Sequence, residues 1–202
     1  NLIMRSRSEE DYLKAIYSLW KNENPISTTD IANHLKMKAS SVTDMLQKLS
    51  EKGWINYKKY KGATLTKEGK IIALSIIRKH RLWETFLVNN LHFKWDEVHE
   101  IAEQLEHIIS PELVNRLDDY LGNPSFDPHG DPIPNINGKI PKSFSIPLID
   151  LPINSIGHVV GVSLDTAPFL QYLDKLDIHL GSNIKVVEKF EFDQSLAILI
   201  DK

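Results

Sequence analysis

The sequence predicts a mainly helical protein with small β-sheets. Amphipathic helical repeats fill most of residues 1–122, and β-rich runs fill the C-terminal part. Seven of the ten prolines lie in residues 124–152, where no helical period is visible, so this stretch is predicted to be a linker. The β-rich runs beyond it, with one helix predicted among them, favour a small β-barrel.

The first three predicted helices have the spacing of a helix-turn-helix motif. The first spans residues 8–22, and Asp11, three residues after its first serine, completes a predicted capping box. A second, short helix begins after Ser27, and a break of three residues separates it from a third helix that begins at Ser40 and is closed by Gly53. Apolar residues recur at i, i+3, i+4 and i+7 in the first and third helices, which predicts one buried face on each.

Two β-prone runs, 54–57 and 63–66, surround a lysine-rich turn and predict a basic hairpin. A helix-turn-helix followed by such a hairpin is a winged helix, which places one helix in the major groove and the wing on the DNA backbone. The charge agrees, because residues 1–82 hold 16 basic and 8 acidic residues, whereas residues 83–202 hold 8 basic and 19 acidic ones. Double-stranded DNA is therefore the predicted partner.

The predicted DNA contacts are polar residues that face away from the apolar stripes, together with the lysines of the hairpin. They are Thr28, Lys38, Ser40, Ser41, Thr43, Gln47, Lys48, Lys58, Lys59 and Lys61. Lysines suit phosphates and carry no sequence information, whereas hydroxyl and amide groups also reach base edges. Arginine and amide pairs that read bases directly are sparse here, so shape readout is expected to contribute. A solvated helix face with a lysine-rich turn is the alternative interpretation of these residues, but the capping boxes, the turn length, the hairpin and the local positive charge together favour DNA binding.

Histidines and carboxylates gather on two later helices. The helix predicted from Trp95 to Ile109 carries His99, Glu103, Glu106 and His107 on one arc beside its apolar stripe. The preceding helix, predicted from Lys67 to about Leu91 after a cap at Thr66, adds His80 and Glu84 at i and i+4.

Such donors, without thiolate or thioether, favour Mn²⁺ or Fe²⁺, although Zn²⁺, Co²⁺ and Ni²⁺ bind the same atoms. The chain has no cysteine, which excludes disulfides, thiolate zinc sites, iron–sulfur clusters and a cysteine nucleophile.

Five strings of the sequence stand out by their order and spacing: Glu10-Asp11-Tyr12-Leu13, Ser40-Ser41-Val42-Thr43, Arg78-Lys79-His80-Arg81-Leu82, Val98-His99-Glu100 through Leu105-Glu106-His107, and Gly130-Asp131-Pro132-Ile133-Pro134. Together they resemble the diphtheria toxin repressor and manganese transport regulator family of metal-dependent transcriptional repressors. The resemblance covers residues 5 to about 140 well and the remainder weakly.

The resemblance implies a homodimeric repressor that a metal activates and that binds palindromic operator DNA. It implies three domains: a winged helix in residues 1–72, a helical dimerisation and metal-binding domain in 73–140, and an SH3-like β-barrel in 141–202. The implied primary metal site consists of Asp11, Glu103, Glu106 and His107. The implied ancillary positions are His80, Glu84 and His99, and Asp165 is a further carboxylate candidate.

Four positions distinguish this chain within that resemblance. In the iron-responsive branch, thioether and thiol stand where this chain has Asp11 and Glu103, so the implied metal is Mn²⁺ first and Fe²⁺ second. Lys14 stands where a two-metal manganese regulator carries a second carboxylate, and Pro168 replaces an amide side chain in the third domain. The number of metals per subunit therefore stays open.

Two other function classes fit parts of the sequence. A winged-helix regulator of a small organic ligand would use the His and Glu residues only structurally, and a metallohydrolase would use them around a bound water. No convincing general base or substrate loop is visible, so we do not expect an enzyme. No run approaches 18 apolar residues and no apolar leader is visible, which predicts a cytoplasmic protein without membrane contact.

Overall fold

The computed structural model describes residues 5–20 and 24–201 and separates the chain into two compact units. The first unit comprises Asn1–Lys79, Glu106–Ile109 and Pro134–Lys139. The second comprises His80–Leu105, Ser110–Ile133 and Ile140–Lys202. No described helix is long and apolar enough to cross a membrane.

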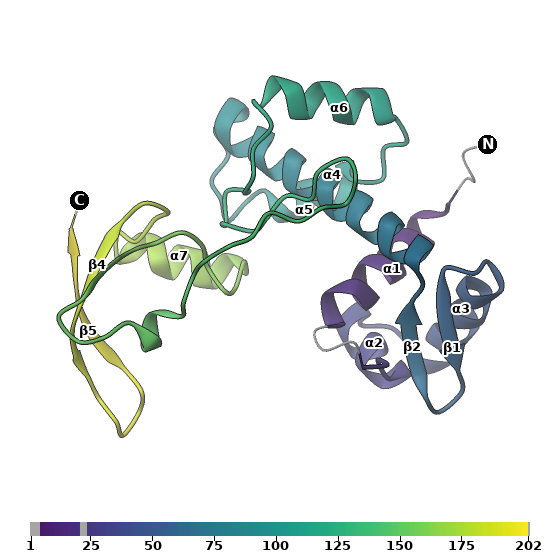
Figure 1. Cartoon of the computed structure of the whole chain (residues 1–202), viewed down its shortest axis with the longest axis horizontal. Helices are drawn as coiled ribbons and strands as arrows, with labels where there is room; N and C mark the ends of the chain where they lie inside the picture. The colour runs from purple at the N-terminus through teal and green to yellow at the C-terminus, as the bar shows by residue number, and fades with distance from the viewer. Residues whose placement is uncertain (1–4, 21–23, 202) are drawn as a thin grey trace. The chain divides into compact units, whose positions relative to one another are not determined.

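The first unit contains the predicted helix-turn-helix and hairpin. Its helices are α1 (Arg7–Leu19), α2 (Thr28–Leu35) and α3 (Ala39–Glu51). The strands β1 (Ile55–Lys58) and β2 (Gly62–Leu65) pair antiparallel, and in Figure 1 this hairpin lies beside α3. The predicted order of elements is confirmed, and Gly53 adopts the positive φ expected of a residue that ends a helix.

The capping box predicted at Ser8 and Asp11 is wrong. Ser6 is the N-cap of α1, where its hydroxyl accepts from the backbone N–H of Glu9 and the Glu9 carboxylate accepts from the N–H of Ser6. The two pairs have the same spacing, so the pattern alone does not separate them. The described part of α1 ends at Leu19, and the predicted end at Asn22 lies outside the described residues.

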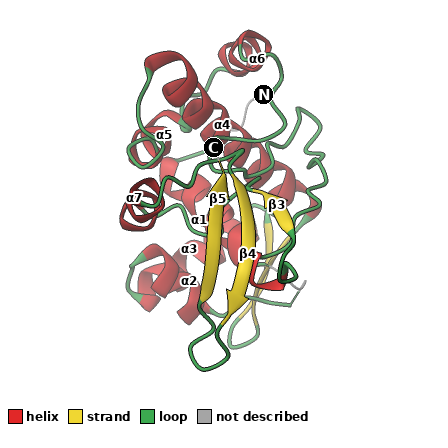
Figure 2. Ribbon diagram, turned by 90° about the vertical axis from the view of Figure 1, so that its left-hand side faces the viewer, coloured by secondary structure: helices red, strands yellow, loops and turns green. Residues whose placement is uncertain are grey.

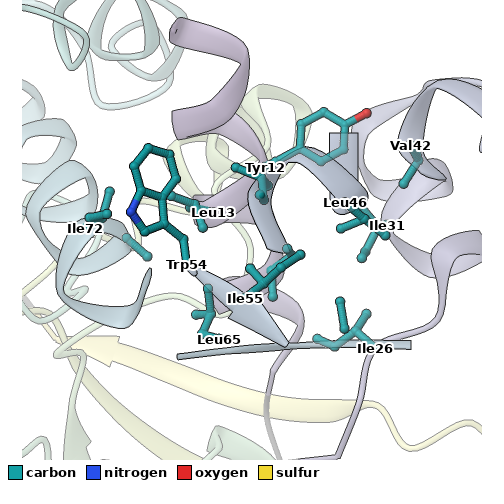
Figure 3. Packing of buried hydrophobic residues seen from close by; sticks show 14 of the residues in the cluster. Tyr12, Leu13, Ile26, Ile31, Val42, Leu46, Trp54, Ile55, Leu65 and Ile72 are labelled. Carbon is teal, nitrogen blue, oxygen red and sulfur yellow. The ribbon is translucent and has the colours of Figure 1, made fainter. Parts of the chain in front are cut away.

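A single apolar cluster holds the first unit together. Figure 3 shows its members Tyr12 and Leu13 from α1 gathered with Ile31 of α2, Leu46 of α3 and Trp54, which precedes the hairpin. These side chains are at most 2% exposed, and burying each one contributes ~1.5–3 kcal/mol. The cluster therefore fixes α1 against the helix-turn-helix.

The helix α4 (Lys67–Leu91) has the predicted bounds, and Thr66 caps it by accepting from the N–H of Gly69. In the second unit, α6 (Pro111–Tyr120) begins after the N-cap residue Ser110 and has proline in its first turn. The helix α5 spans only His99–Leu105, so the prediction of a helix from Trp95 to Ile109 is wrong at both ends.

Apolar periodicity continues through this segment, but residues 95–98 and 106–107 form turns. The side chains of Trp95 and Asp96 are engaged elsewhere in the unit, with Asp174 at 2.9 Å and Gln171 at 2.8 Å. The turn at 106–107 places Glu106 and His107 beyond the helix rather than on the predicted arc.

The C-terminal part of the second unit contains a short 3-10 helix, η1 (Leu148–Asp150), and α7 (Ala167–Lys175), where a helix was predicted. Its strands are β3 (Ile156–His158), β4 (Asn183–Lys189) and β5 (Leu196–Asp201). Figure 2 shows β4 between β3 and β5 in an antiparallel sheet. The described strands form an open three-stranded sheet, whose register shifts between β4 and β5 at Val186/Glu188, and the β-barrel stays a prediction.

The buried carboxylate of Glu9 predicts an acid-sensitive fold. Burial opposes its ionisation, but hydrogen bonds from Lys52, Lys48 and the N–H of Ser6 outweigh this and lower its pKa from 4.5 to about 2. A lowered pKa stabilises the folded state above the unfolded value, and this contribution disappears as the pH falls through 2. We expect Glu9→Gln to remove ~1–3 kcal/mol of unfolding free energy at neutral pH and to flatten its decline below about pH 5.

Urea unfolding in chelator at several pH values measures this dependence. The exposed Glu68 of α4 supplies the control variant Glu68→Gln, which should retain the acid dependence of the parent. Equal slopes for Glu9→Gln and the parent would contradict the assignment.

Candidate metal centre

Three ligand-type side chains meet in the first unit, and we call Asp11, Glu106 and His107 the metal centre. Asp11 comes from the second turn of α1, and the other two residues come from the turn after residue 105. The Nε2 atom of His107 lies 3.1 Å from Oδ1 of Asp11 and 3.7 Å from Oε1 of Glu106. Glu106 is fully buried, whereas the side chain of Asp11 is 35% exposed. Three of the four residues predicted for the primary site are therefore brought together from distant parts of the sequence.

The imidazole of His107 is oriented by Glu10, which the sequence analysis did not identify. The Nδ1 atom of His107 lies 2.8 Å from Oε2 of Glu10. An Nδ1–H that donates to this carboxylate leaves the Nε2 lone pair facing Asp11 and Glu106, which is the arrangement found behind metal-bound histidines. The acidic pair at positions 10 and 11 was a signal, but adjacent helical residues point in different directions, so spacing does not assign them to one site.

Basic side chains contact Glu106 of the metal centre and the neighbouring Glu10. Lys14 donates to Oε2 of Glu106 at 2.7 Å. Oε1 of Glu10 lies 3.3 Å from Nε of Arg5, and its Oε2 lies 4.0 Å from Nζ of Lys79. Burial lowers the pKa of Lys79, and the Glu10 and Glu106 carboxylates oppose this shift. Buried carboxylates in this position need such partners.

A second cluster lies in the other unit and consists of His80, Glu84 and His99. Nε2 of His80 and Nδ1 of His99 lie 2.9 and 3.4 Å from the same Glu84 oxygen, Oε1. The i, i+4 pair predicted on α4 is thus joined by α5. His99 also contacts the other two predicted carboxylates, with Oε1 of Glu103 at 3.7 Å and Oδ2 of Asp165 at 3.8 Å. The role expected for Glu103 in the metal centre stays a prediction.

The second cluster has two buried neighbours that sequence reasoning missed, His129 and Asp127. Nδ1 of His129 lies 3.7 Å from Oε2 of Glu84, and its Nε2 lies 2.8 Å from the carbonyl oxygen of Trp95. Burial opposes charge on Glu84, but the three imidazoles outweigh it and lower the pKa of Glu84. Burial likewise disfavours the protonated form of His129, but the Glu84 carboxylate prevails and raises the pKa of His129 to about 9.

The pKa of the Asp127 carboxyl is raised, whereas that of Glu84 is lowered. Burial and the neighbouring Glu84 charge raise its pKa to about 7. Its Oδ1 accepts from the N–H groups of His129 and Asp131, so it shapes the loop that holds the His129 ring. The string around residue 130 is therefore structural support for the second cluster.

The predicted DNA contacts lie on α2, α3 and the hairpin as expected. The exposed members are Lys38, Ser40, Ser41, Gln47, Lys48, Lys58, Lys59 and Lys61, whereas Thr28 and Thr43 are half-buried. Thr43 donates to the carbonyl oxygen of Ala39 within α3. Lys48 lies 2.9 Å from Glu9, and Lys52 lies 2.6 Å from the same oxygen, so Lys48 already has a carboxylate partner.

Both clusters fit a divalent cation by their donor chemistry. The atoms offered by Asp11, Glu106 and His107 lie within 4.8 Å of one another, as do those of His80, Glu84 and His99. Nε2 of His107 and Nδ1 of His99 are buried and make no hydrogen bond with any residue in the described part of the chain. A histidine lone pair directed at carboxylate oxygens is a nitrogen and oxygen donor set suited to first-row divalent metals.

Three family models match consecutive parts of the chain. Residues 4–63 match the iron dependent repressor N-terminal DNA binding domain, residues 66–135 match the iron dependent repressor metal binding and dimerisation domain, and residues 146–202 match the FeoA domain.

Individual proteins match as well. An uncharacterised HTH-type transcriptional regulator of Methanocaldococcus jannaschii is 43% identical over 113 residues, which cover 55% of this chain and 90% of that protein. The iron-dependent repressor IdeR of Mycobacterium tuberculosis is 32% identical over 127 residues, 63% of this chain and 55% of that protein. The solved structure of a manganese-dependent transcriptional repressor in complex with manganese is 36% identical with a TM-score of 0.82, covering 95% of this chain and 93% of that one.

Removal of the Glu10 carboxylate tests the geometry of the metal centre. Glu10→Ala should lower the affinity for Mn²⁺ about 10- to 100-fold, because His107 loses the partner that orients its ring. Isothermal titration calorimetry measures this effect, and Glu68→Ala serves as a matched control on an exposed carboxylate. An unchanged Mn²⁺ affinity in Glu10→Ala would show that the His107 ring needs no such support.

Proposed function

The chain belongs to the diphtheria toxin repressor and manganese transport regulator family of metal-dependent transcriptional repressors, and from this premise we propose that it is a homodimeric repressor that binds palindromic operator DNA when a divalent cation is bound. Mn²⁺ is the proposed activator, with Fe²⁺ second, because carboxylate oxygens and imidazole nitrogen are the available donors. The genes under control would be those of metal homeostasis.

The position of the His107 ring is the observation that supports this proposal most directly. His107 has one ring nitrogen 2.8 Å from Glu10 and the other facing two carboxylates from separate parts of the first unit. A purely structural histidine has no need of a second nitrogen directed at two further acidic groups. Asp11, Glu106 and His107 are the residues that would hold the cation, with Glu103 as a further proposed ligand and His80, Glu84, His99 and Asp165 as a proposed second site.

A cation bound there supplies positive charge that offsets the repulsion between the carboxylates. Fixing Asp11 also fixes Glu9, because both residues belong to α1, and Glu9 connects α1 to the DNA-binding part of the unit. Glu9 binds Lys48 and Lys52 at the C-terminal end of α3. Ordering α1 therefore orders the proposed recognition helix, and dimerisation would set the spacing of two such helices along the operator.

The DNA contacts proposed from the sequence divide into two kinds. The hydroxyl and amide residues of α2 and α3 would reach base edges and phosphates, whereas the hairpin lysines would contact phosphates alone. Lys48 is the exception, since its carboxylate partner Glu9 competes with phosphate. We place it in the coupling between α1 and α3.

The domain assignment also belongs to the proposal. We propose the winged helix in residues 1–72, the dimerisation and metal-binding domain in 73–140, and an SH3-like barrel in 141–202. The open sheet of β3, β4 and β5, packed through Ile184 and Ile198 on Leu173 of α7, supports the small β-rich domain in this assignment.

Loss of the metal centre should abolish activation. Asp11→Ala and Glu106→Ala should lose Mn²⁺-stimulated operator binding and retain the circular dichroism of the parent, because they remove ligands and not the apolar cluster. Fluorescence anisotropy with operator DNA measures affinity against Mn²⁺, Fe²⁺, Zn²⁺ and Co²⁺, with Glu68→Ala as the control. Operator binding indifferent to chelator and to both substitutions would contradict the proposal and favour an organic effector.

The hairpin lysines should act without regard to sequence. Lys58→Ala should weaken binding to operator and unrelated DNA by the same factor and reduce the slope of log affinity against log salt by about one. Lys142→Ala, on an exposed lysine outside the winged helix, is the control. Loss confined to the operator would assign Lys58 to base reading instead.

A further inference from the structure

Lys14 is in direct contact with the metal centre, although a lysine is not a metal ligand in its charged form. Its Nζ lies 2.7 Å from Oε2 of Glu106. The side chain of Lys14 is 18% exposed and Glu106 is fully buried, so little water screens this pair. The contact therefore acts on the charge of a proposed ligand at short range.

The position of Lys14 on α1 explains why it reaches the same residues as Asp11. The two residues are three apart, and side chains at i and i+3 lie on one face of a helix. Asp11 approaches His107, while Lys14 approaches the neighbouring Glu106. One helix face thus presents an anion and a cation to one turn of the chain.

The two oxygens of Glu106 have different surroundings. Oε2 accepts the hydrogen bond from Lys14, whereas Oε1 lies 3.7 Å from Nε2 of His107. A carboxylate that gives one oxygen to an ammonium has its other oxygen for a metal. Glu106 then cannot hold two divalent cations with one on each oxygen, and the oxygen that remains for a metal lies on the side of His107.

We infer that Lys14 is a resident cation of the metal centre, which limits the centre to one divalent ion and sets its affinity. This inference rests on the proposed function, because it requires that Asp11, Glu106 and His107 bind a metal. The ammonium repels an incoming divalent ion and also neutralises part of the carboxylate charge that attracts it. Both effects lower the affinity for the metal, so that the centre binds metal at a higher concentration than it would without Lys14.

Lys14 has a second consequence for the metal-free protein. The ammonium joins α1 to the turn at residues 106–107 through Glu106, beside the contact between Glu10 and His107. The ammonium therefore offsets part of the repulsion between the carboxylates of the centre when no metal is bound. Removing the ammonium should make operator binding in chelator weaker while making the response to metal start at lower concentration.

The test compares four full-length proteins in which the second cluster is weakened by His99→Ala, so that the ion count reports on the metal centre. They are the His99→Ala parent and the same protein with Lys14→Gln, Lys14→Glu or Lys14→Arg. Calorimetry and equilibrium dialysis with Mn²⁺ give affinity and stoichiometry, and circular dichroism checks the fold. Lys67→Gln, on an exposed lysine of α4, is the charge-loss control.

Lys14→Gln should bind one Mn²⁺ at least about tenfold more tightly than the parent, since a unit charge at contact distance has this effect on a divalent ion even in water. Lys14→Glu should admit a second ion at the centre. Lys14→Arg, which keeps the cation, and the Lys67→Gln control should match the parent. Parent affinity in Lys14→Gln, or two ions at the centre of the parent, would overturn the inference.

Different outcomes test the metal centre and the role of Lys14. If neither the parent nor any Lys14 variant binds Mn²⁺, the metal centre itself is wrong and the role of Lys14 falls with it. If Mn²⁺ stimulates operator binding in the parent and the Lys14 variants behave identically, the proposed function stands and only the resident cation is rejected.

Discussion

The burial of carboxylates is the constraint on which the first unit depends. Glu9, Glu10 and Glu106 are at most 4% exposed, and each meets a positively charged or imidazole group within 3.3 Å. A buried carboxylate without such a partner costs several kcal/mol, so these contacts select one arrangement of α1 against its neighbours. The apolar cluster supplies most of the stability of the unit, and the ion pairs specify the orientation of the helix within it.

Consecutive acidic residues on α1 let one helix reach several partners. Successive side chains point about 100° apart around a helix, so Glu9, Glu10 and Asp11 face different neighbours. Glu9 faces the lysines of α3, Glu10 faces Nδ1 of His107, and Asp11 faces its Nε2. A cation bound at Asp11 is therefore one residue along α1 from Glu10, which holds the His107 ring, and two residues from Glu9, which binds the lysines of α3.

Local sequence signals predicted most of the secondary structure, and tertiary contacts decided the rest. Thr66 caps α4 as predicted, because a cap needs only neighbouring residues. The start of α1 was misplaced because Ser6–Glu9 and Ser8–Asp11 have the same spacing. The predicted helix ran beyond Leu105, the end of α5, because the apolar periodicity continues there. The contact between Glu10 and His107 joins residues 97 positions apart, and no spacing rule predicts it. The ligand types in the centre were predictable, whereas the groups that orient and neutralise them emerge only from the fold.

The second cluster meets the same constraint with different chemistry. Glu84 is 2% exposed and is surrounded by His80, His99 and His129. An imidazole that gives up its proton changes from a counter-charge into a ligand, whereas the ammonium of Lys14 keeps its charge and has no lone pair to offer. A cation entering the second cluster therefore meets imidazole groups that can act as ligands beside Glu84. One entering the metal centre must share Glu106 with a fixed positive charge, so the two clusters should differ in the metal concentration to which they respond.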